Sequence, residues 1–151
     1  MSRAIPSSCF GIDSVASLLV DTGFLVALYR ARDELHGEAL AFLERTHIAL
    51  VTISAVVVET CYFLDARGKI ALLEWIATGG LSVVELPADA YPAAAKLLQK
   101  YRELDADFTD VALVWFAEQI GERRILTADE RDFAVFRLKG KRRFELVKWY
   151  E

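Results

Sequence analysis

Cysteine, histidine and long apolar runs are scarce in this chain of 151 residues, and each scarcity excludes a class of protein. Two cysteines, Cys9 and Cys61, do not make the disulfide framework of a small secreted domain, and cytosolic thiols stay reduced. No apolar run approaches the roughly 20 residues that span a bilayer. The N-terminus does not resemble a secretory signal, because Asp13 interrupts its one apolar stretch. We therefore expect a cytoplasmic protein with no membrane segment.

Familiar site motifs are also missing. The sequence has no Gly-rich phosphate loop, no HExxH, no cysteine pairs at zinc spacing and no EF-hand loop. Its two histidines, His36 and His47, do not form a Ser-His-Asp grouping, and a lone histidine is more often a surface or satisfied residue than a ligand. These absences leave the acidic side chains as the main candidates for chemistry.

The hydrophobic fraction of 54% favours one well-buried core. Residues 1–17 show little periodicity and are predicted to be an N-terminal extension to a single domain over residues 18–151. From there, short apolar strands alternate with helical patterns, which predicts an α/β sandwich with a mostly parallel sheet. The predicted strands are 17–21, 49–53, 81–86, 124–127 and 144–148. The predicted helices are 22–29, 35–45, 55–66, 69–77, 87–103 and 111–120.

The net charge of −4 is unevenly distributed along the chain. Residues 121–151 carry nine basic against six acidic residues, whereas residues 1–120 carry nine against sixteen. The local excess of three positive charges can contact phosphate groups, although a solvated basic surface is the commoner explanation of such runs.

Four acidic residues, Asp21, Glu59, Asp110 and Asp129, stand within or next to apolar runs, where burying a carboxylate is costly without a partner. Asp21 and Asp129 follow predicted strands, and the other two lie near the starts of helices. In an open α/β sheet, ligands bind beyond the carboxyl ends of the strands. Clustered carboxylates raise one another's pKa, and a hard cation such as Mg²⁺ or Mn²⁺ removes that conflict. The pattern therefore predicts a divalent-metal site, with one or two metals.

Each acid taken alone also has a structural explanation. Asp21 suits a helix N-cap, Asp129 suits a turn, and Asp107 suits a capping box with Asp110 at the third helical position. Glu59 is hardest to explain, because it interrupts a largely apolar helix. The metal-site prediction therefore depends on the conjunction of the four acids.

Four segments in this order resemble the PIN-domain family, and most closely its VapC-type ribonuclease toxins: residues 18–28, 52–60, 107–114 and 125–133. The resemblance implies a three-layer α/β/α sandwich with a five-stranded, mostly parallel sheet. It also implies Mg²⁺- or Mn²⁺-dependent RNA hydrolysis, a homodimer, and a VapB-like antitoxin that blocks the pocket. By position, the catalytic and metal-binding residues would be Asp21, Glu59, Asp110 and Asp129, with Asp107, Asp132 and Thr127 as accessory residues. The first seventeen residues have no counterpart in such toxins.

Our primary hypothesis is therefore a metal-dependent endoribonuclease in which a metal-activated water attacks the phosphodiester. A PIN-like module that binds RNA or a protein partner without turnover is the alternative. A phosphoacceptor domain ranks last, because Asp21 has no acidic neighbour. The predicted RNA phosphate contacts are Arg123, Arg124, Arg131, Lys141, Arg142 and Arg143.

Overall fold

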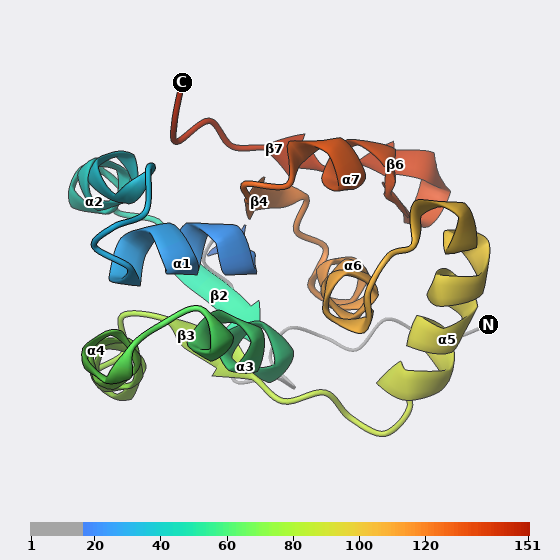
Figure 1. The fold of residues 1–151 in the computed structure, drawn as a ribbon. Helices are drawn as coiled ribbons and strands as arrows, with labels where there is room; N and C mark the ends of the chain where they lie inside the picture. Colours follow the sequence, from blue (N-terminus) through green and yellow to red (C-terminus); the bar gives the residue numbers. More distant parts are fainter. Residues whose placement is uncertain (1–16) are drawn as a thin grey trace.

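A five-stranded sheet forms the centre of the protein. The computed structural model describes residues 17–151 (Figure 1). The strand order is β3-β2-β1-β4-β7, and all four pairings are parallel. The predicted five-stranded, mostly parallel sheet is thus confirmed. The strands are β1 (Ser17–Val20), β2 (Ala49–Ile53), β3 (Ser82–Val84), β4 (Arg124–Leu126) and β7 (Glu145–Leu146).

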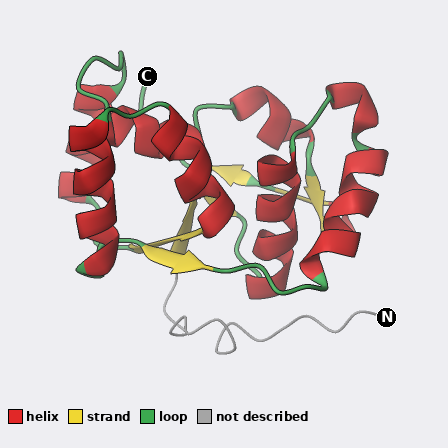
Figure 2. Cartoon of the chain, turned by 60° about the horizontal axis from the view of Figure 1, so that its bottom comes forward, coloured by secondary structure: helices red, strands yellow, loops and turns green. Residues whose placement is uncertain are grey.

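Helices cover both faces of this sheet, as parallel strands with right-handed crossovers require. In Figure 1, α1, α2 and α4 lie on one side of the strands and α5 and α6 on the other. Figure 2 shows the strands enclosed between helices, which confirms the predicted three-layer sandwich. The helices are α1 (Thr22–Tyr29), α2 (His36–Arg45), α3 (Ser54–Tyr62), α4 (Ala66–Ala77), α5 (Ala90–Lys100), α6 (Phe108–Ile120) and α7 (Glu130–Val135).

Two aspartates decide helix boundaries that periodicity alone misplaced. Asp65 caps α4 by accepting a 2.8 Å hydrogen bond from the Gly68 amide, so α4 begins three residues earlier than predicted. Asp107 caps α6 in the same way, accepting from the Asp110 amide at 2.8 Å, and α6 also begins three residues early. Short polar side chains at these positions satisfy helix N–H groups that have no partner within the helix.

Other expected boundaries were also wrong. Asp21 occupies the N-cap position of α1, as its structural explanation predicted, whereas α3 begins at Ser54 and ends at Tyr62, one residue earlier and four residues earlier than predicted. The helix predicted over 87–103 is α5 followed by a separate 3₁₀ turn over Arg102–Leu104. The chain between α7 and β7 forms an unpredicted antiparallel hairpin of β5 (Arg137–Leu138) and β6 (Arg142–Arg143).

The core lies between the sheet and the helices that start at its carboxyl edge. Strand β1 is buried along its whole length, as is α6 from Val111 to Ala117. Cys61 is half-buried against this core with a free thiol, close to its predicted role as a small hydrophobe. The predicted extension lies outside the described residues, except for Ser17, which begins β1. Within residues 17–151, no helix is both long and apolar enough to cross a bilayer.

Candidate active site

The strand order reverses between β1 and β4, because the chain leaves β1 toward β2 and returns to β1's other side only at β4. Connections diverge at such a switch point and leave a crevice beyond the strand ends. Asp21 directly follows β1, and Asp129 is the third residue after β4. Helix α3, which carries Glu59, packs against both α1 and α6. As a result, six acidic side chains line one cavity of about 510 Å³: Asp21, Asp33, Glu59, Asp107, Asp110 and Asp129.

Asp21 is the most deeply buried of these acids, with 5% of its surface exposed. The pKa of its carboxyl is raised to about 6, mainly by burial and to a lesser extent by the charges of Glu59 and Asp129. Hydrogen bonds from the Thr22 amide and the Thr127 hydroxyl act in the opposite direction. The Asp21 backbone is fixed as well, since its N–H donates to the Leu126 carbonyl at 2.9 Å. The fold therefore holds this carboxylate in place at an energetic cost.

Thr127 connects three parts of the site. Its hydroxyl donates to Oδ2 of Asp21 at 2.9 Å and accepts the Asp129 N–H at 2.9 Å. Its carbonyl accepts a 3.0 Å hydrogen bond from the indole of Trp149, which is buried against Phe24. The position that the sequence predicted as accessory thus aligns the strand ends that carry two of the acids.

Asp110 has the most strongly shifted carboxyl. The pKa of this carboxyl is raised to about 8, mainly by burial and then by the charges of Asp21, Asp107, Asp129 and Glu59, in decreasing order. Its backbone N–H is meanwhile capped by Asp107. The structural and chemical explanations of Asp110 are therefore compatible. Its backbone lies in the capped first turn of α6, and its carboxylate faces the other acids.

Asp110 and Asp129 are close enough to share one cation with Asp132 of α7. One carboxylate oxygen each from Asp110, Asp129 and Asp132 lies within 4.8 Å of the other two. The pKa of Asp132 is raised by burial and by the Asp129 charge. Glu59 is steadied by a 2.7 Å hydrogen bond from the Thr22 hydroxyl. An all-carboxylate donor set suits a hard cation such as Mg²⁺ or Mn²⁺, so these residues fit the predicted metal.

The six predicted RNA contacts do not lie together. Arg123 and Arg124 lie at the N-terminal end of β4, and the acidic cavity lies beyond the C-terminal ends of the strands. Arg124 pairs with Glu122 at 3.1 Å, and the Arg123 guanidinium donates to the carbonyl of Arg143 at 3.3 Å. Lys141 and Arg142 belong to the hairpin before β7. Arg131 alone of the six stands beside the acids, where its charge lowers the pKa of Asp132.

The predictions from sequence missed Arg30, Asp33 and Phe63, three polar or aromatic side chains that line the acidic cavity. Arg30 and Asp33 fall between the predicted helices 22–29 and 35–45, and Phe63 lies within the helix predicted over 55–66, which in fact ends at Tyr62. The one feature of the sequence that could have indicated Arg30 is that two arginines, Arg30 and Arg32, stand in the short connection directly after α1. Without the fold, nothing indicates that the end of α1 approaches the end of α3.

A cavity of carboxylates at the switch point of a parallel α/β sheet defines a class of site, one suited to a divalent metal and a phosphate ester. The sequence matches the PIN domain over residues 18–138, and the chain belongs to this family, as the resemblance predicted. It is similar to ribonuclease VapC26 of Mycobacterium tuberculosis, with 28% identity over 134 residues that cover 86% of this chain and 99% of the relative.

Two solved structures share the fold. One is Mycobacterium tuberculosis VapC20, described as a sarcin-ricin loop cleaving toxin. Its TM-score is 0.70 at 24% identity, over 76% of this chain and 91% of that one. The other is a toxin-antitoxin complex from Klebsiella pneumoniae, with a TM-score of 0.55 at 19% identity over 78% and 91% of the two chains.

Proposed function

We propose that this protein is a metal-dependent endoribonuclease that hydrolyses RNA phosphodiester bonds and serves as the toxin of a toxin-antitoxin pair. The observation that carries the proposal is the convergence of six carboxylates on one cavity at the switch point. Membership of the PIN domain family and similarity to a VapC ribonuclease support the same activity.

Asp110, Asp129 and Asp132 form the closest carboxylate group and would hold the metal together with Asp21 and Glu59. When bound, Mg²⁺ or Mn²⁺ supplies Lewis-acid stabilisation of the reacting phosphodiester and lowers the pKa of a water. The protein's own contribution is placement. Thr127 fixes Asp21 and the Thr22 hydroxyl fixes Glu59, so that these carboxylates need not reorganise when substrate arrives.

The partners follow from the same proposal. RNA is the substrate, a VapB-like antitoxin is the inhibitor, and the protein acts as a homodimer in the cytoplasm. Large apolar side chains that are exposed on α3, at its C-cap and on α4 support a protein partner. They are Val58, Tyr62, Phe63, Ile70 and Leu73. Light scattering of the purified protein measures the dimer, and co-purification with the product of an adjacent gene tests the antitoxin.

The deciding experiment measures cleavage of RNA by wild type and Asp110→Asn, each with EDTA, Mg²⁺ or Mn²⁺. We expect cleavage by wild type only when metal is present, and a loss of at least about 100-fold in Asp110→Asn, because a charge at a metal site cannot be replaced by an amide. Activity that survives both EDTA and the substitution would refute metal dependence. RNA binding with no cleavage under any condition would instead favour the binding module.

A further inference from the structure

A second cavity of about 340 Å³ adjoins the acidic one, and it is basic. Arg30 and Phe63 line both cavities, so these two side chains form the boundary between them. Arg32 and Arg67 line the second cavity only. We call this site the arginine pocket and define it by Arg30, Arg32, Arg67 and Phe63. It lies where the end of α1 meets the start of α4.

The backbone that carries the first two arginines is well ordered by its own hydrogen bonds. The Arg30 N–H donates to the Val26 carbonyl at 2.8 Å, and the Asp33 N–H donates to the Arg30 carbonyl at 2.9 Å. Oδ1 of Asp33 then accepts from the Leu35 N–H at 2.9 Å. The ring of His36 closes the connection through a 2.8 Å hydrogen bond with the Ala27 carbonyl. A short, fixed loop of this kind presents the arginines without further ordering.

These guanidinium groups are available to a ligand. Within residues 17–151, none of the three makes an ion pair, and all three residues are exposed. Asp65 also lines the pocket, but its carboxylate is engaged in capping α4 through the Gly68 amide. The pocket therefore carries a net positive charge next to a cavity of the opposite sign. Such an arrangement attracts an anion that extends past the acidic cavity.

Phe63 supplies the second element of the site. Phe63 is 52% exposed at the C-terminal end of α3. A large apolar ring with that exposure, between a basic and an acidic cavity, has the character of a stacking surface. Unpaired bases stack on aromatic side chains while arginines follow the strand's phosphates.

We propose that the arginine pocket holds a phosphate of single-stranded RNA next to the one being cleaved, with a neighbouring base stacked on Phe63. This inference rests on the proposed ribonuclease function and names how its substrate is held. The acidic cavity repels a polyanion, so affinity must come from cations outside it. Arg123, Arg124 and Arg143 are at the far edge of the sheet, whereas the arginine pocket shares a wall with the acids.

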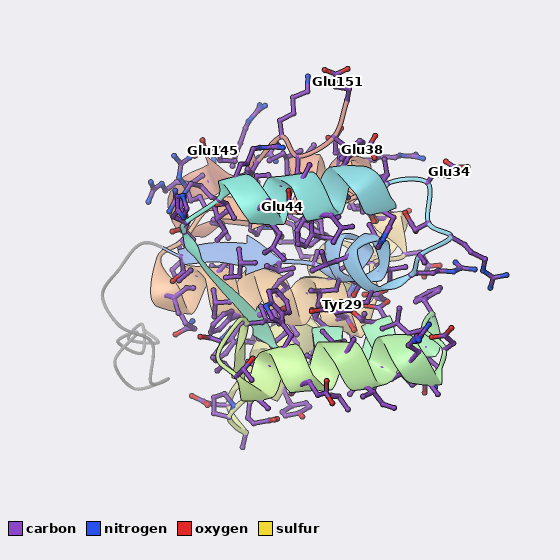
Figure 3. The ribbon with its side chains drawn as sticks, turned by 90° about the vertical axis from the view of Figure 1, so that its left-hand side faces the viewer. Tyr29, Glu34, Glu38, Glu44, Glu145 and Glu151 are labelled. Atoms are coloured by element: carbon purple, nitrogen blue, oxygen red, sulfur yellow. The ribbon has the colours of Figure 1, made fainter. Side chains whose placement is uncertain are left out.

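The surface next to the arginine pocket carries acidic side chains. Figure 3 views the side formed by α2 and α4, with Tyr29 between the two helices. Glu34, Glu38 and Glu44 project from the α2 side of this face. These carboxylates would repel RNA phosphates, whereas the arginine pocket would attract them. Phosphate contacts position the strand, and stacking on Phe63 adds affinity with little dependence on which base is stacked.

The test is a binding measurement that does not depend on cleavage. A fluorescently labelled single-stranded RNA of about 12 nucleotides, with Mn²⁺ present, is titrated with an Asp110→Asn protein that also carries Arg30→Gln and Arg67→Gln. We expect Kd to rise at least tenfold, and the slope of log Kd against log salt to fall by about 0.7 per lost contact. Phe63→Leu should weaken binding about fivefold or more without changing that slope.

The matched control is Lys69→Gln with Arg102→Gln, which removes two positive charges from exposed positions outside both cavities. It should leave Kd within twofold. In otherwise wild-type protein, the arginine variants should raise KM far more than they lower kcat. Thermal unfolding confirms folding, since all the substituted basic residues are exposed.

Equal weakening by the control pair, or no change from the arginine substitutions, overturns the proposal. Arginine variants that keep RNA affinity but no longer bind a protein inhibitor would assign the pocket to an acidic peptide instead. If wild type fails to cleave any RNA while binding still depends on Arg30 and Arg67, the proposed nuclease function fails and the pocket stands.

Discussion

The hydroxyl of Thr127 donates a 2.9 Å hydrogen bond to Oδ2 of Asp21, across 106 residues of sequence. Both residues are nearly inaccessible to solvent, at 2% and 5% exposure. The bond joins the ends of two adjacent strands, and it partly offsets the cost of burying a carboxylate. Thr127→Val keeps the shape and removes this donor as well as the acceptor for the Asp129 N–H.

We expect Thr127→Val to lower the free energy of unfolding at pH 8 by about 1–3 kcal/mol, because buried polar groups lose their partner. The pKa of Asp21 should rise above its wild-type value. Urea denaturation measures the first effect and carboxyl NMR titration the second. Thr127→Ser keeps the hydroxyl and is the control. If Thr127→Val and Thr127→Ser have equal stability and the same Asp21 titration, the hydrogen bond does not contribute to either property.

The stability of the metal-free protein should fall as pH rises from about 4 to about 8. Folding raises the pKa of Asp21 to about 6 and of Asp110 to about 8, both from 3.8. In that window the unfolded chain releases protons that the folded chain keeps, so ionisation favours unfolding. The loss begins near pH 4 and levels off above the folded pKa values. For Asp21, a shift of about two pKa units corresponds to about 3 kcal/mol.

Asp110→Asn should flatten this profile and make the metal-free protein more stable than wild type at pH 8. The unfolding midpoint in urea, measured with EDTA from pH 4 to pH 9, gives the curve. Glu103→Gln, at an exposed position outside the cavity, should leave the profile unchanged. A wild-type curve that rises through this range would contradict the pKa shifts.

Added Mn²⁺ should stabilise the protein strongly at pH 8 and little at pH 5. Protons and metal compete for the same carboxylates, and Asp110 is largely protonated at the lower pH. Stabilisation follows the ratio of metal concentration to Kd, about 2.7 kcal/mol at one hundred times Kd. Thermal unfolding with and without Mn²⁺ at both pH values tests this. Asp129→Asn should reduce the shift at pH 8, and a shift of equal size at pH 5 would argue against a carboxylate site.

A methyl group at Gly23 should displace the loop that carries Asp129. A Cβ there would stand 2.6 Å from the Ala128 Cβ, in the loop that carries Asp129. We expect Gly23→Ala to cost about 1–3 kcal/mol and to lower cleavage, because the loop must move. Gly37→Ala is the matched control. Nothing lies within 4 Å of its Cβ position, and it sits in α2, so it should be neutral or stabilising by up to about 1 kcal/mol. Urea denaturation measures the free energy of unfolding of both variants. Equal changes for Gly23→Ala and Gly37→Ala would contradict the predicted clash at Gly23.

The acids were predictable because each breaks a local pattern. Asp21 ends a buried strand and Glu59 interrupts an apolar helix, and strand ends in a parallel sheet share one edge. The closeness of Asp132 to Asp110 was less accessible, since it depends on how α7 turns after its Asp129 cap. The basic residues were harder still. A cluster in sequence, such as residues 137–143, indicates charge but not the edge of the sheet on which it lies.

The sequence by itself determined the alternation of strands and helices, the parallel sheet, and the acids that the chain places at strand ends and helix starts. These features depend on local periodicity and on the cost of burying charge, both of which are written along the chain. Only the tertiary structure decided that Asp21 and Thr127 bond, and that Arg30 meets Phe63 at the wall of the acidic cavity. These arrangements depend on strand order and helix packing, which bring together residues that are far apart in the sequence. The residues that flank them in the sequence do not indicate which ones will become neighbours.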